Sequence, residues 1–140
     1  MASISLTSAS IHPLEGALCR NFVAGGALTV GYAVYLDSSG YVQHADANAG
    51  EVQSRGIGVV VESKDGETSV TSGDSCSVCV MGPVGGYSGM TPGEPVYVSS
   101  TVGRIDQTAP TGGAYQRSIG YAESSVKLFV FPCANDPSSV

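Results

Sequence analysis

The cysteines are the residues of this chain whose spacing could support chemistry. Cys76 and Cys79 are separated by two residues, which is the spacing of half a zinc site or of a redox-active dithiol. A tetrahedral zinc site needs two further ligands, and the remaining candidates are distant in sequence: Cys19, Cys133, His12 and His44. Residues three apart in an extended strand also point to opposite faces, which suits chelation badly. We expect buried free thiols, with a zinc site and a disulfide among the four cysteines as alternatives.

Other catalytic arrangements are incomplete. Gly86-Tyr87-Ser88-Gly89-Met90 approaches a nucleophile elbow, but Met90 stands where the final glycine belongs and the strand–turn–helix setting is missing. Two carboxylate pairs fall in predicted turns, where Asp caps the backbone: Asp37 with Asp46, and Asp65 with Glu67. There is no glycine-rich phosphate loop with its lysine. The sequence therefore predicts a protein that is not an enzyme and that uses no metal or other cofactor.

The elements that must carry these residues are strands. Helical periodicity is almost absent, and apolar segments rich in Val, Ile, Tyr and Phe recur between turn residues. The predicted strands are Ala33–Asp37, Tyr41–Ala45, Gly56–Glu62, Ser75–Met81, Pro95–Ser99, Arg117–Ala122 and Lys127–Phe131. The glycine-rich run Met81–Met90 is predicted as a loop or a bulged edge. Short strands at this spacing indicate an all-β protein, a compact β-barrel or β-sandwich.

An internal repeat organises these strands. Gly31–Leu36 is echoed by Gly93–Val98, and Arg55–Gly58 is echoed by Arg117–Gly120 at the same offset. We therefore predict two hairpin-based pseudo-repeats, at about residues 31–63 and 93–125, each a hairpin followed by a returning strand. The alternative is the general similarity of β-hairpins to one another.

The ends of the chain differ from its middle. Residues 1–20 are predicted as an N-terminal arm and entry segment, 21–132 as the β domain and 133–140 as a flexible C-terminal tail. Apolar residues at Ile4, Leu6 and Ile11 alternate with polar ones. This pattern fits an extended arm that pairs with a neighbour or lies along a partner surface, and it fits an ordinary frayed or edge strand equally well.

Composition narrows the class of partner. The net charge is −6, and the six basic residues are scattered, which argues against a nucleic-acid binder. The longest apolar runs are only a few residues, so the sequence predicts no membrane span. Charged residues are only 13% of the chain, about half of the usual quarter. A surface that is poor in charge suits a protein of an assembly.

Four stretches resemble a known family: Gly31–Ala47, Arg55–Ser63, Gly73–Ser99 and Ile119–Pro132. Their pattern of turns and strands is similar to that of bacteriophage head decoration, or capsid cement, proteins. The resemblance implies a β module, often trimeric, that is made in the host cytoplasm, binds major capsid protein on the outer surface of the virion and stabilises the shell. Similar modules occur in tail fibres and spikes, so a receptor- or carbohydrate-binding tail module is the alternative.

Within this interpretation we can name residues for partner contact. The arm residues Ile4, Leu6 and Ile11 are the first candidates, and exposed tyrosines are the second, because Tyr is favoured in interfaces. Tyr87 is the tyrosine that we select from four: Tyr32, Tyr41, Tyr87 and Tyr115. The expected oligomer is a homotrimer that gains avidity from several contacts at once.

Overall fold

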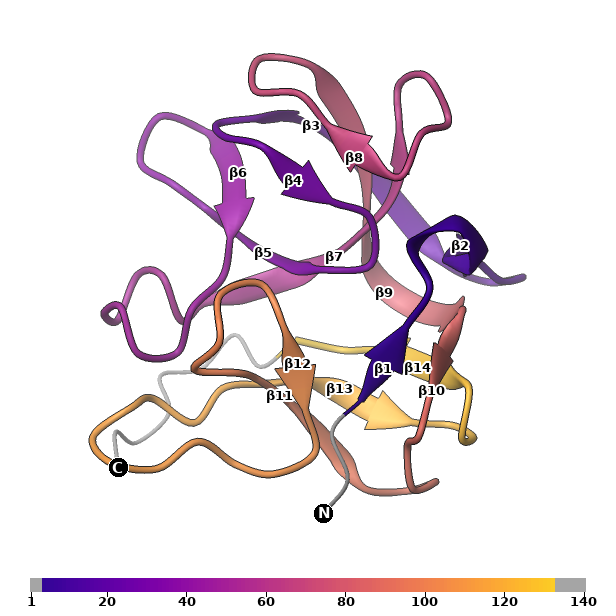
Figure 1. Ribbon diagram of the computed structural model, residues 1–140, viewed down its shortest axis with the longest axis vertical. Helices are drawn as coiled ribbons and strands as arrows, with labels where there is room; N and C mark the ends of the chain where they lie inside the picture. The colour runs from indigo at the N-terminus through magenta and orange to yellow at the C-terminus, as the bar shows by residue number, and fades with distance from the viewer. Residues whose placement is uncertain (1–3, 133–140) are drawn as a thin grey trace.

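The computed structural model describes residues 4–132, and this part of the chain is built from β-strands and one 3-10 turn, Ser8–Ser10 (Figure 1). The strands are β1 (Ser5–Leu6), β2 (His12–Pro13), β3 (Leu18–Ala24), β4 (Leu28–Thr29), β5 (Ala33–Leu36), β6 (Tyr41–His44), β7 (Gly56–Ser63), β8 (Ser69–Val70), β9 (Ser75–Gly85), β10 (Tyr87–Ser88), β11 (Pro95–Val98), β12 (Ile105–Asp106), β13 (Ser118–Ala122) and β14 (Lys127–Val130). The predicted all-β fold is confirmed. No helix in residues 4–132 is long and apolar enough to cross a membrane.

Five strands close into a barrel, which occupies the upper half of Figure 1. β9 pairs with β3, β3 with β6, β6 with β5, β5 with β7, and β7 returns to β9. The β3–β6 pairing is parallel and the others are antiparallel. The barrel strands carry small branched side chains that are fully buried: Val34, Val42, Val59, Val60 and Val78. Because closure removes free sheet edges, every barrel strand has a partner on both sides.

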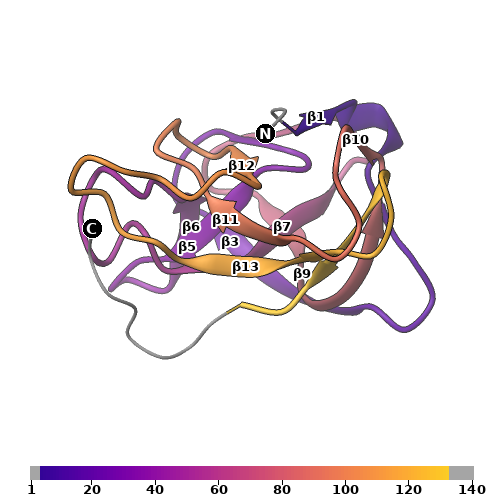
Figure 2. The same cartoon turned by 90° about the horizontal axis from the view of Figure 1, so that it is seen from below.

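A second sheet lies at one end of the barrel. Its strands follow the order β12-β11-β13-β14-β9, and in Figure 2, which looks at this end of the molecule, β11 and β13 cross in front of the barrel strands. Val98 and Ile119 of this sheet pack against Gly56 of β7, where an added Cβ would lie 2.9 Å from the Val98 side chain. The buried residues of barrel and second sheet form one hydrophobic cluster. The two halves therefore share a single core.

Strand β9 belongs to both halves. Its first part pairs with β3 and β7, and its last residues, 82–85, pair with β14. The prediction that this strand ends at Met81 was wrong, and of the two alternatives for the run that follows, a loop or a bulged edge, the loop is excluded up to Gly85. Gly82 adopts a φ of 115°, which residues with a side chain avoid, so the strand bends from one sheet into the other without losing its pairing.

Strand β3 was missed by the sequence analysis. It carries the exposed Arg20 and Asn21 between half-buried Cys19 and Phe22, so it lacks both the strict alternation and the apolar run that identify a strand. Tertiary pairing with β9 along its whole length makes it a strand. It also crosses the boundary predicted at residue 20.

Two three-stranded units have matching pairings. β5 pairs with β6 and β7, and β11 pairs with β12 and β13. Each unit has a register shift at its Val-Tyr dipeptide, between Val34 and Tyr35 in the first and between Val96 and Tyr97 in the second. These are the segments that the sequence repeat singles out. Whether they descend from one duplicated segment stays a prediction.

The extended N-terminal arm is not seen in the residues that the structure describes. β1 pairs with β10, β2 pairs with β9, and Ile4 and Ile11 are buried in the core. The guanidinium of Arg104 donates a hydrogen bond to the Ile4 carbonyl over 2.8 Å. The segment is therefore fastened to its own domain, as an edge strand would be. The tail predicted at 133–140 lies outside the described residues.

Candidate binding surface

The outer side of the second sheet carries apolar side chains where a solvated sheet would carry polar ones. Successive residues of a strand point to opposite faces. Leu128 and Val130 of β14 are fully buried, so Phe129 and Phe131 point outward. Phe131 is 57% exposed. A strand that is apolar on both faces needs a partner on each side.

The strand register places further apolar residues beside Phe129. Tyr121 and Pro83 lie directly opposite Phe129 on the two neighbouring strands, and Pro95 lies opposite Tyr121. The rings of Tyr121 and Phe129 stack with centroids 5.2 Å apart and planes inclined by 18°. Directly opposed residues share one face of a sheet. The four side chains therefore form a row across β11, β13, β14 and β9.

A second apolar row continues from the first. Leu18 and Met81 are paired across β3 and β9, with 54% and 44% of their surfaces exposed. Met81 and Phe131 both line a groove of about 390 Å³ whose other walls include Ile57 and Pro132. We call the combined surface the apolar face and define it by seven residues: Leu18, Met81, Pro83, Pro95, Tyr121, Phe129 and Phe131.

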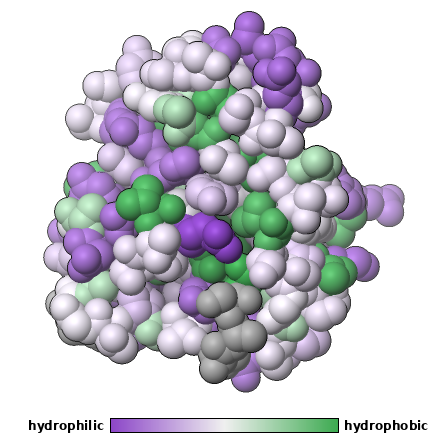
Figure 3. All heavy atoms as spheres, viewed as in Figure 1, coloured by the Kyte–Doolittle hydropathy of each residue, from purple (hydrophilic) through white to green (hydrophobic). Residues whose placement is uncertain are grey.

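The apolar face is comparable in size to the largest apolar patch of a typical soluble monomer, about 300–600 Å². With large side chains presenting about 150–250 Å² each, its four most exposed residues leave about 400 Å² of mostly apolar surface in water. A patch of this extent often marks a binding site. The face seen in Figure 3 is mostly pale, with separated hydrophobic and hydrophilic areas.

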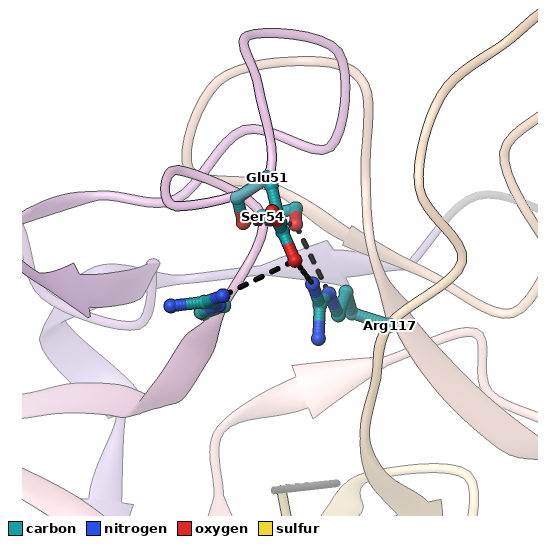
Figure 4. Close-up of polar contacts among 4 residues, drawn as sticks. Glu51, Ser54 and Arg117 are labelled. Carbon is teal, nitrogen blue, oxygen red and sulfur yellow. Dashed lines mark hydrogen bonds and ion pairs between the residues drawn. The ribbon is translucent and has the colours of Figure 1, made fainter. Parts of the chain in front are cut away.

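Two arginines of a charged cluster, Arg55 and Arg117, line the groove. The Glu51 carboxylate forms ion pairs with Arg55 at 3.2 Å and with Arg117 at 3.8 Å (Figure 4). The Nε of Arg117 also donates a hydrogen bond to the Ser54 hydroxyl over 3.1 Å. The side chain of Arg117 is 4% exposed, whereas that of Arg55 is 54% exposed. An exposed ion pair contributes little to stability, but a buried guanidinium must keep its partners. Glu51 and Ser54 therefore hold Arg117 at the groove as a fixed cation.

The cysteine and histidine side chains that could take part in chemistry are buried or partly buried and contribute to packing. Burial, with the neighbouring Cys19, raises the pKa of the Cys79 thiol to about 12, and burial raises that of Cys76. His44 accepts a hydrogen bond from the Thr29 amide over 3.0 Å, and burial lowers its pKa. Within residues 4–132, no three His, Cys, Asp or Glu side chains lie close enough together to hold a metal ion. Cys133 lies outside this range.

The sequence-predicted contact residues lie inside the domain. Ile4, Ile11 and Tyr87 are 1%, 6% and 2% exposed, and Leu6 is partly buried against the core. The Tyr87 hydroxyl donates to the Gly31 carbonyl over 2.8 Å. These side chains fasten the N-terminal segment, and a partner could reach them only if that segment were released. Among the other tyrosines considered, Tyr41 is exposed and two are half-buried, Tyr32 and Tyr115.

Sequence reasoning missed the apolar face, although one signal for it was present. The run Leu128-Phe129-Val130-Phe131 has no polar residue on either face of its strand. In a sheet with one solvated face, alternate residues should be polar. The assignment of Leu18 and Met81 to the same surface depends on the β3–β9 pairing, which no local pattern revealed.

Comparison with known proteins identifies the family of this chain. No curated protein matches it. A family model described as structural cement protein (E217 gp24/Pam3 gp6) matches residues 8–128, which is most of the chain and includes strands of the barrel and of the second sheet. This agrees with the resemblance in turns and strands, and it does not favour a tail module. The chain belongs to the family of phage structural cement proteins.

Proposed function

We propose that this protein stabilises a phage capsid by binding major capsid protein through the apolar face, as a homo-oligomer and without catalysis. Membership of the structural cement protein family makes it a structural protein of the outer capsid surface. The observation that carries the choice of surface is the contiguous row of exposed and half-buried apolar side chains on the outer side of the second sheet. The proposed oligomer is a trimer, as the resemblance to decoration proteins implies.

A cement protein stabilises a capsid through thermodynamic linkage between binding and assembly. A protein that binds the assembled shell and not the separated subunits adds its binding free energy to the stability of the shell. Removing about 400 Å² of apolar surface from water at about 25 cal/mol per Å² provides up to about 10 kcal/mol before the costs of association. Copies joined in one oligomer add avidity without new contacts. The seven residues of the apolar face carry no charged side chains, so burying them against the capsid has no cost of desolvating charges.

The test uses capsids that lack the protein. Cosedimentation should give saturable binding, and the melting temperature of the shell should rise when the protein is added. Phe131→Ser and Leu18→Ser should each weaken binding about tenfold or more, because each removes an exposed apolar contact. Val102→Ser is the matched control: Val102 is 53% exposed but is not part of the apolar face, so its affinity should stay within about twofold of the parent.

Two outcomes would overturn the choice of surface. Unchanged capsid affinity in both apolar-face variants would show that another face binds the shell. Loss of self-association in these variants, measured by analytical ultracentrifugation, with capsid affinity per subunit retained, would assign the apolar face to contacts between copies. Failure of the parent protein to bind any capsid would refute the function itself.

A further inference from the structure

Two cysteines meet across one seam of the barrel. Cys19 of β3 and Cys79 of β9 are direct partners in the antiparallel register of these strands. Directly opposed residues in such a pair have Cα atoms about 4.5–5.5 Å apart and share one face of the sheet. This separation lies within the range of about 4.4–6.8 Å that a disulfide bond spans. Interaction with the Cys19 side chain is also among the causes of the raised pKa of Cys79.

The other described cysteine has no such partner. Cys76 lies opposite Phe22 on one side and opposite Ser63 on the other. The Cys76-Ser77-Val78-Cys79 spacing that attracts attention in the sequence therefore does not define the pair. The seam between β3 and β9 does.

We propose that Cys19 and Cys79 form a cross-strand disulfide once the protein leaves the reducing cytoplasm, and that this bond locks the barrel closed. A protein on the outer capsid surface is released with the virion into an oxidising medium, where disulfides persist. The bond would join strands that are 60 positions apart at these residues, and bridges that close long loops restrict the unfolded chain most.

The exposure of the two thiols sets the order of the reaction. Cys19 is partly buried whereas Cys79 is fully buried, so Cys19 reacts first: its thiolate attacks a low-molecular-weight disulfide such as oxidised glutathione, forming a mixed disulfide and expelling one small thiolate. Cys79 then loses its proton to solvent, attacks the Cys19 sulfur and expels the second small thiolate. Two protein thiols are oxidised, and one small disulfide is reduced to two thiols.

The buried partner makes the second step slow. Cys79 is fully buried, its pKa is raised to about 12, and its Sγ contacts the Met81 carbonyl at 3.4 Å. Because the thiolate is the attacking species, closure of the bond should accelerate as the pH rises. The thiols should therefore survive brief exposure to oxidant and close over longer incubation.

The experiment compares reduced protein with protein incubated with oxidised glutathione. Mass spectrometry of the intact protein should show the loss of two hydrogen atoms. Mass spectrometry after peptide digestion should show a single bridge between Cys19 and Cys79. The melting temperature should rise by about 10 °C and fall back when dithiothreitol is added. Cys19→Ser should abolish both changes, and it is safer for folding than Cys79→Ser because Cys19 is only partly buried.

Control variants separate this pair from the other thiols. Cys76→Ser and Cys133→Ser should both retain the bridge and the rise in melting temperature. Free thiols that persist at all four cysteines after prolonged oxidation at alkaline pH would overturn the proposal, as would a bridge that maps to Cys76 or Cys133. A Cys19–Cys79 bridge without any rise in melting temperature would refute the lock. None of these readouts involves the capsid.

Discussion

Replacing Gly58 with alanine tests how closely β7 must approach β9. A Cβ atom at position 58 would lie 2.0 Å from the Cys79 carbonyl oxygen and 2.9 Å from its carbon. Close carbon–oxygen contacts between strands are about 3.3–3.6 Å. The obstacle is backbone, so no side chain can rotate out of the way, and the strands must separate by more than about 1 Å.

The magnitude follows from the hydrogen bonds at this seam. Backbone N–H···O bonds tolerate donor–acceptor distances only up to about 3.2 Å, so such a displacement breaks those next to the substitution. Each buried group left unpaired costs about 1–3 kcal/mol. With two such groups left unpaired, the free energy of unfolding should fall by about 2–6 kcal/mol, a large part of the roughly 5–15 kcal/mol that stabilises a typical domain.

The assay is urea unfolding followed by far-ultraviolet circular dichroism. Gly66→Ala is the control, because Gly66 has a φ of 75° but no atom within 4 Å of its added Cβ; it should cost only about 1–2 kcal/mol. Gly120→Ala should behave like Gly58→Ala, since its Cβ would lie 2.0 Å from the Phe129 carbonyl oxygen. A Gly58→Ala protein as stable as the Gly66→Ala protein would refute the reasoning. An insoluble Gly58→Ala beside a soluble Gly66→Ala agrees with it.

Three further predictions concern buried groups. Burial holds the pKa of His44 in the folded protein below its ordinary value of 6.5, so the unfolded chain binds a proton first as the pH drops. The free energy of unfolding should therefore fall as the pH drops from about 7.5 through 6.5 toward the folded pKa. Calorimetry should find this loss reduced in His44→Gln but kept in His12→Gln. Tyr87→Phe leaves the Gly31 carbonyl without its donor and should lower the free energy of unfolding by about 1–3 kcal/mol; an unchanged urea midpoint would contradict this. Leu128→Ala, at a fully buried site, should lower the free energy of unfolding by about 2–5 kcal/mol in the same assay. The control Val102→Ala, at an exposed site, should lower it by less than about 0.5 kcal/mol. Similar values for the two variants would argue against the assignment of Leu128 to the core.

Local patterns were sufficient to predict the strands with ordinary sequence signals. β5, β6 and β11 begin at the predicted residues and end one residue before the predicted limits, because each is a short run of Val and Tyr bounded by turn residues. β3 could not be predicted from local patterns, because its polar residues face solvent and its pairing with β9 makes it a strand. The bend in β9 was mistaken for a loop because glycine and proline usually end a strand.

The candidate surface was harder to predict than the fold. Ile4, Ile11 and Tyr87 are apolar or aromatic, and sequence alone does not distinguish a side chain that contacts a partner from one that fills the core. Whether they are buried depends on the return of the N-terminal segment to β10 and on the Arg104 hydrogen bond to Ile4, a contact between residues 100 positions apart. The apolar face likewise depends on register between strands, which tertiary pairing determines.

The continuity of β9 has a mechanical consequence. Modules joined by a linker can rotate relative to one another, so a force on one is absorbed by the hinge. Here a single strand runs from the barrel seam into the second sheet and is paired on both sides of its bend. If the shell binds the apolar face as proposed, tension on the second sheet passes into the barrel along the covalent backbone of β9 and its paired neighbours, and no hinge lies between the two halves to absorb it.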